Sequence, residues 1–261
     1  MTYIITDIGA TKTRIAASHD LASFDDPVIL DTPQGYGAAL ELVSKTAQNL
    51  AGGELKAIAV GKPRPDNLPE WAGKSFEADL AKLAGVPVTM ENDTAMVGLG
   101  EAAYGAGKGA SILVYITVST GVNGVRIVDG RIDRSKEGFE IGGQYLATTG
   151  TVSLENLVSG KSIQERFGAH PKDLGKDNPV WEELAAVLAY GVHNTILHWS
   201  PDRVVLGGSM FNDIGIPVES VQRHVASIMR KFPEVPDIVH SSLGDVGGLW
   251  GGLARLKQAH A

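Results

Sequence analysis

The chain of 261 residues is long enough to form one large domain or two lobes with separate hydrophobic cores. Its formal charge of −7 is spread along the sequence with no basic stripe, which argues against a nucleic-acid-binding surface. The absence of cysteine excludes disulfides, zinc sites built on thiolates and cysteine nucleophiles.

The first predicted element is a hairpin, and no basic segment with the apolar core of a signal peptide precedes it. Residues 3–6 form its first strand, DIGATKT forms a tight turn at residues 7–13, and residues 15–17 form the second strand. No apolar run further along the chain reaches membrane-spanning length. We therefore expect a cytoplasmic protein that binds neither membrane nor nucleic acid.

The segment between residues 18 and 111 alternates predicted helices and strands. Helices are expected at residues 38–50, at 75–83 with Ser75 as the N-cap, and at 94–104; strands are expected at 55–61 and 86–90. The helix at 94–104 is rich in alanine and glycine, so it can pack closely against a neighbour. The glycine-rich stretch 105–109 lacks the first glycine and the Ser or Thr of a P-loop, so we expect a flexible hinge between two lobes.

The hairpin pattern recurs at residues 112–128, where ILVYIT runs into VSTGVNG and then VRIV. Glycine lets the backbone approach a ligand closely, and threonine hydroxyls and backbone N–H groups donate hydrogen bonds to phosphate oxygens. Either copy alone is more often an ordinary hairpin with a glycine turn. Two copies in one chain suggest two related lobes that hold a nucleotide between them.

The rest of the chain repeats the same plan. Helices are expected from residue 153, at 179–199 and at 218–231, strands at 203–209 and 237–240, and a glycine-rich closing helix at 244–253. Alternating strands and helices imply a partly parallel sheet in each lobe. Ligands of such sheets bind at the carboxyl ends of the strands, where Asp7, Asp93, Thr120 and Gly207 are all expected to lie.

Seven motifs follow one another along nearly the whole chain: DIGATKTR (7–14), ENDTAMVGLGEAAYGAGKG (91–109), STGVNGV (119–125), FEIGG (139–143), SLENLVSG (153–160), VVLGGS (204–209) and GDVGGLWGGL (244–253). In this order they resemble the motifs of the ROK family of sugar kinases and related repressors. The resemblance implies an α/β protein with the two-lobed actin-like ATPase (ribonuclease H-like) fold and an interlobe cleft. It also implies an N-terminal lobe of residues 1–106, a C-terminal lobe of residues 107–246, and a last helix, residues 247–261, that packs back on the first lobe.

Two departures from the family pattern bear on the chemistry. The family's Glu-x-Gly-His motif lacks its histidine here, because Gly143 follows Gly142. The family's cysteine-rich zinc loop is replaced by the short, cysteine-free segment 144–154, so we expect no structural zinc. Losing the imidazole leaves space and removes one hydrogen bond, worth about 1 kcal/mol, so the preferred sugar can differ from glucose.

The resemblance implies glucokinase-like, ATP-dependent phosphorylation of a hexose or an N-acetylhexosamine, assisted by Mg²⁺. Asp93 follows a strand and starts a helix, where it can accept the proton of an attacking sugar hydroxyl while the helix dipole favours its ionised form. The family match favours it as the catalytic base, and the competing interpretation is a helix N-cap. By the same resemblance Asp7 holds Mg²⁺ through water, and its competing interpretation is a turn-forming aspartate.

The remaining site residues rest on the same resemblance. The expected sugar-binding residues are Asn67, Asn92, Asp93, Glu140 and Glu155. The expected nucleotide-binding residues are Gly9, Thr11, Lys12, Thr120, Gly121, Gly124, Gly207 and Gly208. The structural alternatives are solvated carboxylates for the two glutamates, a solvated strand residue for Lys12, a turn for Asn67, and ordinary turn glycines.

Other interpretations stay open from the sequence alone. Loss of the histidine and the zinc loop also fits a non-catalytic sugar-binding or regulatory protein, although a pure binder has no need of Asp93. Some relatives use polyphosphate as the donor, typically through a basic groove, but this acidic chain has no run of lysine or arginine. Relatives commonly form dimers, so a homodimer is a further expectation, and the sequence does not select one hexose.

Overall fold

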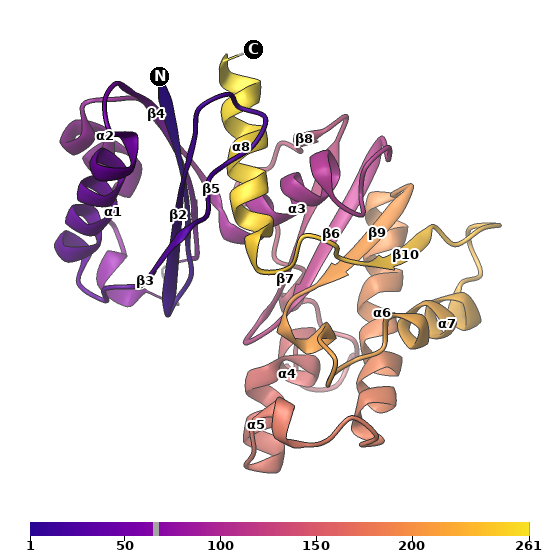
Figure 1. Ribbon diagram of the computed structural model, residues 1–261. Coiled ribbons are helices and arrows are strands. Elements are labelled where there is room, and N and C mark those ends of the chain that lie inside the picture. The colour runs from indigo at the N-terminus through magenta and orange to yellow at the C-terminus, as the bar shows by residue number, and fades with distance from the viewer. Residues whose placement is uncertain (65–67, 261) are drawn as a thin grey trace. The chain divides into compact units, whose positions relative to one another are not determined.

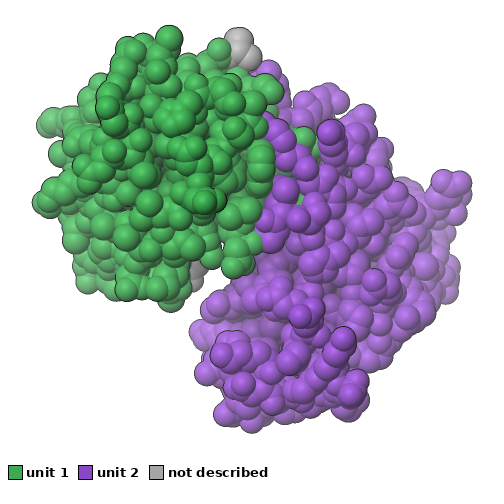
Figure 2. All heavy atoms as spheres, in the orientation of Figure 1, with its two compact units in different colours: residues 1–103, 245–261 green, residues 104–244 purple. Residues whose placement is uncertain are grey.

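Two five-stranded sheets with the same strand order organise the chain (Figure 1). The structure is a computed structural model and describes residues 1–64 and 68–260. The strand order is β3-β2-β1-β4-β5 in the first sheet and, read in the corresponding direction, β8-β7-β6-β9-β10 in the second. Each sheet belongs to one of two compact units, residues 1–103 with 245–261 and residues 104–244, which Figure 2 distinguishes by colour.

The first unit is a mixed sheet covered by helices. Its strands are β1 (Thr2–Ile8), β2 (Lys12–Ser18), β3 (Val28–Asp31), β4 (Leu55–Lys62) and β5 (Val88–Asn92). Its helices are α1 (Tyr36–Ala51), α2 (Phe76–Ala84), α3 (Asp93–Tyr104) and α8 (Gly247–His260). β1, β2 and β3 form an antiparallel meander, whereas β4 and β5 run parallel to β1. Figure 1 shows α1 and α2 on one face of this sheet and α8 on the other.

Alternation along β1 explains how both faces are buried. Ile4 and Ile8 belong to the core cluster that includes α1 and α2. Ile5 points to the opposite face, because successive strand residues alternate between faces. There it meets α8 so closely that a β-carbon at Gly252 would lie 2.3 Å from Ile5 Cγ2. The glycines of α8 therefore allow the helix to approach the sheet.

The second unit repeats the sheet with a different set of covering helices. Its strands are β6 (Ile112–Val118), β7 (Val122–Val128), β8 (Arg131–Ile132), β9 (Arg203–Gly207) and β10 (Asp237–His240). Its helices are α4 (Leu154–Val158), α5 (Gly160–Phe167), α6 (Val180–Trp199) and α7 (Val218–Ile228). β9 and β10 run parallel to β6, as β4 and β5 do to β1.

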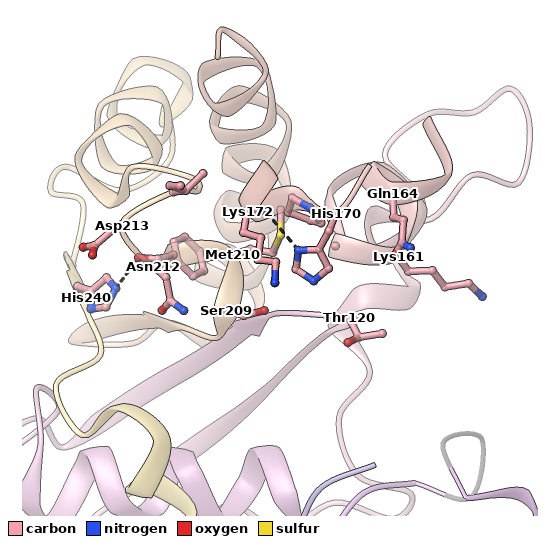
Figure 3. Close-up of a pocket in the computed structure, with 14 residues that line it drawn as sticks. Thr120, Lys161, Gln164, His170, Lys172, Ser209, Met210, Asn212, Asp213 and His240 are labelled. Atoms are coloured by element: carbon pink, nitrogen blue, oxygen red, sulfur yellow. Dashed lines mark hydrogen bonds between the residues drawn. The ribbon is translucent and has the colours of Figure 1, made fainter. Parts of the chain in front are cut away.

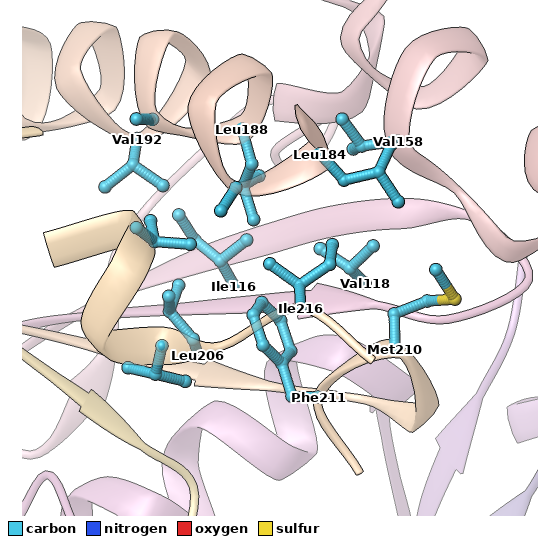
Figure 4. Packing of buried hydrophobic residues seen from close by; sticks show 14 of the residues in the cluster. Ile116, Val118, Val158, Leu184, Leu188, Val192, Leu206, Met210, Phe211 and Ile216 are labelled. Atoms are coloured by element: carbon cyan, nitrogen blue, oxygen red, sulfur yellow. The ribbon is translucent and has the colours of Figure 1, made fainter. Parts of the chain in front are cut away.

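The core of the second unit lies between its sheet and α6 (Figure 4). The α6 residues Leu184, Leu188 and Val192 are spaced at intervals of four, so they share one helix face. That face is buried together with strand residues such as Ile116 and Leu206. None of the described helices combines the length and apolar character needed to cross a membrane.

Element boundaries differ from the sequence-based expectations at a few places. The strand expected at 86–90 is Val88–Asn92, and the helix expected to reach residue 231 ends at Ile228. Ser75 precedes α2 as expected, but its side chain makes no capping hydrogen bond. The stretch 105–109 contains a turn in which the Lys108 N–H donates to the Gly105 carbonyl at 3.1 Å, and Arg203 Nη1 donates to the Ala106 carbonyl at 3.0 Å. Its role as a hinge stays a prediction.

Candidate active site

Two aspartates lie at the carboxyl-end edge of the first unit's sheet. Asp7 is near the end of β1, opposite Gly61 of β4, and Asp93 directly follows β5 as the first residue of α3. Because β1, β4 and β5 are parallel neighbours, their carboxyl ends share one edge. The carboxylates are close enough for the charge of Asp93 to raise the pKa of Asp7. The structure thus brings these two predicted residues together.

The surroundings of Asp7 favour its neutral form. Burial raises the pKa of Asp7 to about 7; the charge of Asp93 adds to the rise, Arg14 opposes it, and Asp245 adds further. The carboxyl group lies against the first turn of α8, where a β-carbon at Gly248 would be 2.5 Å from Asp7 Cγ. Asp7 makes no side-chain hydrogen bond within the described part of the chain. Its negative charge therefore has no hydrogen-bonded protein partner.

Asp93 is half-buried and oriented by the start of α3. Its Oδ1 accepts a hydrogen bond from the Thr94 N–H at 2.7 Å. Burial raises the pKa of Asp93, while this N–H and the charge of Lys62 lower it. The neighbouring Asn92 caps the helix, because its Oδ1 accepts from the Ala95 N–H at 3.3 Å. The capping role that competed for Asp93 is taken by Asn92.

Lys62 is a charged neighbour of this edge that the sequence analysis missed. It is the last residue of β4 and lies opposite Asn92 in the parallel register. Its ammonium donates to the Pro63 carbonyl at 2.9 Å and lies 5.8 Å from the ring centroid of Trp71. Burial lowers the pKa of Lys62, and the charge of Asp93 raises it. A search for charged residues at strand ends would have found it had the predicted strand been one residue longer.

The first glycine–threonine turn is held by its own backbone and by a neighbouring strand. The Gly9 N–H donates to the Lys12 carbonyl at 2.9 Å, and the Thr32 hydroxyl donates to the Gly9 carbonyl at 2.8 Å. Lys12 Nζ donates to Asp31 Oδ1 at 2.6 Å between exposed side chains of adjacent strands, which lowers the pKa of Asp31. This ion pair fits the solvated-strand interpretation of Lys12. Thr11 is exposed beside it.

In the second unit, Glu155 holds the second glycine turn. The Ser119 N–H donates to the Gly121 carbonyl at 2.8 Å, and the Val122 N–H donates to Glu155 Oε2 at 2.8 Å. Gly121 lies against the same carboxylate, since a β-carbon there would be 2.7 Å from Oε2. The N–H groups of Thr120 and Gly121 make no hydrogen bond to other described residues, so they remain open donors. Glu155 therefore has a positioning role whether or not it contacts sugar.

The Glu140 segment packs beside this turn and leaves one position open. Asn123 Nδ2 donates to Glu140 Oε1 at 3.4 Å. Gly124 lies within β7, and a β-carbon there would be 2.9 Å from a carbonyl oxygen of β6, so packing alone requires glycine. A β-carbon at Gly143 would meet no atom within 4 Å, so the site of the missing histidine is open. Asn67 lies outside the described residues.

A pocket of about 850 Å³ lies in the second unit (Figure 3). Four segments surround it: the turn after β6, α5 with the 3₁₀ turn Pro171–Asp173, the stretch 209–214 after β9, and the end of β10 at His240. Thr120 lines the pocket, whereas the predicted residues Gly121 and Gly124 do not. The volume is in the range typical of small-molecule sites.

Gly207 and Gly208 shape this pocket without lining it. Gly208 has a φ of 97°, in the left-handed region that favours glycine, and a β-carbon there would be 2.4 Å from the Val118 carbonyl oxygen. A β-carbon at Gly207 would be 2.6 Å from Tyr115 Oη. The two glycines therefore let the chain pass close to β6 and form the lining stretch 209–214.

Most of the polar groups of the pocket were not predicted from the sequence. They are Lys161, Gln164, His170, Lys172, Ser209, Asn212, Asp213 and His240. These residues lie on segments far apart in the chain, so no local pattern unites them. Two of them had a nearby signal: Ser209 is the last residue of the VVLGGS motif, and Lys161 directly follows the SLENLVSG motif. Within residues 1–64 and 68–260, no three His, Cys, Asp or Glu side chains form a group that could hold a metal ion.

The chain belongs to the ROK family, whose model matches residues 3–259. A putative fructokinase of Bacillus subtilis is 27% identical over 97% of this chain and 94% of its own length. A fructokinase of Zymomonas mobilis is 31% identical over 71% of this chain and 67% of its own length. The family resemblance stated from the motifs is therefore confirmed.

Solved structures confirm the α/β actin-like ATPase fold. The ROK hexokinase of Thermus thermophilus matches with a TM-score of 0.86 at 25% identity, and both chains are covered fully. A ROK family glucokinase from Streptomyces griseus, in complex with glucose and AMPPNP, gives 0.81 at 19% identity, covering 99% of this chain and all of the other. A ROK family transcriptional regulator gives 0.85 at 18% identity, covering 99% of this chain and 78% of its own. The last two similarities concern the fold.

Proposed function

We propose that this protein is an ATP-dependent sugar kinase that phosphorylates a hexose, with Asp93 as the general base. The observation that carries the proposal is the half-buried Asp93 carboxylate at the carboxyl end of β5, beside Lys62 and Asp7. The relatives described above support the reaction class, since they are named fructokinase, putative fructokinase and ROK hexokinase.

The proposed step is an in-line phosphoryl transfer. The sugar hydroxyl oxygen attacks the γ-phosphorus, the new O–P bond forms as the bond to the β,γ-bridging oxygen breaks, and the hydroxyl proton passes to Asp93. ADP leaves with the electron pair of the broken bond. A raised pKa makes the Asp93 carboxylate a better proton acceptor than a solvated aspartate. Lys62 favours the ionised form that must be present before the step.

The first unit offers one carboxylate suited to a metal ion. Asp7 is half-buried, makes no side-chain hydrogen bond within the described residues, and has a pKa raised to about 7. A divalent cation nearby would relieve that unfavourable charge, and Mg²⁺ usually keeps several water ligands. We propose that Asp7 orients such water; Mg²⁺ would neutralise the phosphate charge that develops during transfer.

Hexose-dependent ATP consumption tests the proposal. Purified protein is incubated with ATP and Mg²⁺ and with fructose, glucose, mannose or N-acetylmannosamine, and ADP formation is followed. We expect ADP to form with at least one sugar and not without sugar. Failure to consume ATP with any member of the panel, or hydrolysis of ATP at the same rate without sugar, would contradict a hexose kinase.

A non-catalytic sugar sensor is the second candidate, and one observation favours it. Position 143 is an open glycine where the family motif has histidine, so one sugar contact is missing. The fold is also that of a ROK family transcriptional regulator. The same assay discriminates the two functions when calorimetry accompanies it, because a sensor binds a hexose without consuming ATP.

A further inference from the structure

A half-buried arginine lies at the same sheet edge as the two aspartates of the first unit. Arg14 belongs to β2 and lies directly opposite Asp7 of β1 in the antiparallel register. Opposite residues of such a pair point to the same face, and Asp7 points to the face that α8 covers (Figure 1). The charge of Arg14 lowers the pKa of Asp7, so the guanidinium lies near that carboxyl group.

The guanidinium of Arg14 has hydrogen-bond donors that the protein does not use. Within residues 1–64 and 68–260, its one ion pair joins Nη2 to Asp245 Oδ2 at 3.5 Å, and it makes no hydrogen bond. The Asp245 side chain is 92% exposed, so this long pair contributes little to stability. Only 22% of the Arg14 side chain is exposed. A largely buried group with five N–H donors and so weak a partner is suited to an anion that arrives with a ligand.

Two lysines near the same edge are engaged more firmly. Lys12 Nζ donates to Asp31 Oδ1 at 2.6 Å, between exposed side chains. Lys62 Nζ donates to the Pro63 carbonyl at 2.9 Å. Of these three cations, Arg14 is therefore the one whose donors are available to a bound anion.

The proposed reaction requires positive charge at this edge. The sugar oxygen attacks phosphorus while its proton passes to Asp93, so the transferred phosphoryl group lies within a few bond lengths of that carboxylate. Asp93 and Asp245 both raise the pKa of Asp7, which shows that negative charge already accumulates here. During transfer, further negative charge spreads over the three equatorial oxygens of the phosphoryl group. A guanidinium can donate to two such oxygens at once.

We propose that Arg14 contacts the transferred phosphoryl group, with its guanidinium donating to two of the phosphate oxygens while the group passes from the nucleotide to the sugar. The inference rests on the proposed function, because it adds a catalytic residue to that reaction. Arg14 forms no covalent bond and exchanges no proton; it supplies charge and hydrogen bonds where negative charge develops. Until the ligand arrives, the pair with Asp245 keeps the side chain at the edge.

Two nucleotides that differ by one phosphate test this contact. Calorimetry in the presence of Mg²⁺ gives the affinities of ATP and ADP for the wild type, Arg14→Gln and Arg14→Lys. We expect Arg14→Gln to weaken ATP binding roughly five- to twentyfold and ADP binding less than about twofold, because only ATP carries the γ-phosphate. With a hexose that the wild type phosphorylates, kcat of Arg14→Gln should fall by at least about thirtyfold. Arg14→Lys should be intermediate, because lysine keeps the charge but not the two-point contact.

Arg223→Gln is the control. It removes an arginine of α7 that pairs with Glu182 at 2.9 Å, so both affinities and kcat should stay at the wild-type values. Thermal melting shows whether each variant folds. If Arg14→Gln does not fold, Arg14→Lys decides the question: a loss of affinity confined to ATP supports the contact, and equal losses for ATP and ADP contradict it.

The outcomes separate this inference from the proposed function. A wild type that phosphorylates a hexose, with kcat and ATP affinity unchanged in Arg14→Gln, would overturn the role of Arg14 and leave the kinase standing. Equal losses for ATP and ADP would do the same. A wild type whose ATP affinity depends on Arg14 but which phosphorylates no sugar would contradict the proposed function and leave the phosphate contact standing.

Discussion

Asp7 and Asp93 share an edge of one sheet, and their charges make each other less favourable. The ordinary pKa of an aspartate is 3.8, and that of Asp7 is raised to about 7. Between these pH values the folded protein keeps a proton that the unfolded chain has lost. The stabilisation is complete below pH 3.8 and is lost as the pH rises toward 7. Charge on Asp7 thus opposes folding at neutral pH, at the edge where we propose that catalysis takes place.

Replacing Asp7 by asparagine should remove this penalty. We expect Asp7→Asn to melt at a higher temperature than the wild type at pH 8, by roughly 2–4 °C for each kcal/mol of penalty removed. The difference should be smaller at pH 5, because less of the penalty has developed there. Asp31→Asn is the control, since the pKa of Asp31 is lowered by Lys12 and its removal should bring no gain. A melting difference for Asp7→Asn that is equal at both pH values would contradict the linkage.

The charge of Lys62 should affect the pH at which kcat/KM falls on acidification. Removing its charge in Lys62→Met raises the pKa of Asp93, because that charge favours the carboxylate. The fall of kcat/KM at low pH should therefore begin at a higher pH than in the wild type. Lys45→Met, which removes an exposed lysine paired with Glu41 on α1, should leave this pH unchanged. If kcat/KM of Lys62→Met falls at the same low pH as in the wild type, the charge of Lys62 does not influence the pKa of Asp93.

At the residue scale, the site residues that could be predicted from the sequence are those next to the end of a strand. Asp7 and Asp93 were predicted because each lies at or directly after a strand end, a position that the sequence shows. The partners that modify them, Lys62 and Gly248, were not, because burial and close approach arise only when separate segments meet. Lys172, which lines the pocket, was not predicted for the same reason, because it lies in no recognised motif and only folding brings it to the pocket.

At the element scale, the small residues of α3 and α8 decide how these helices meet. A β-carbon at Gly251 of α8 would be 1.7 Å from the Met96 carbonyl oxygen of α3. A β-carbon at Gly100 of α3 would be 2.5 Å from the Gly247 carbonyl oxygen. Close packing of the helix at 94–104 was predicted from its composition. Its partner was not, because α8 is about 150 residues further along the chain.

Gly251→Ala should force these helices apart. We expect the free energy of unfolding to fall by about 3 kcal/mol, because the added methyl group collides with backbone that cannot rotate away. Gly37→Ala is the matched control: it lies in α1, its β-carbon would meet no atom within 4 Å, and alanine favours the helix by up to about 1 kcal/mol. Urea denaturation measures both. Equal stability of the two variants would show that α3 and α8 are not packed this closely.

At the scale of the whole molecule, each unit has its own core. All the buried cluster residues of the second unit lie between positions 114 and 238, and those of the first lie between 4 and 88. The repeat was anticipated from the two related hairpins and from the alternation of strands and helices in each half, but the strand order itself was not. The third antiparallel strand, β8, is two residues long and had no recognisable pattern. The alternation of strands and helices was enough to predict partly parallel sheets, but it did not predict short strands at the sheet edges.

The separate cores predict different fates for two fragments. Residues 104–244 expressed alone should fold and unfold cooperatively, because the described core of this unit uses only these residues. Residues 1–103 should not, because they lack α8 and expose the face of β1 and β4 that it covers. Circular dichroism during thermal unfolding measures both. A cooperative transition in the shorter fragment, or none in 104–244, would contradict this division of the cores.

The most direct measurement of the central claim compares turnover and hexose binding in Asp93→Asn. The amide keeps the size of the side chain but does not accept the proton, so kcat should fall by at least about a hundredfold. Calorimetry should give a hexose affinity close to that of the wild type. An Asp93→Asn protein that phosphorylates its sugar at the wild-type rate would contradict the account.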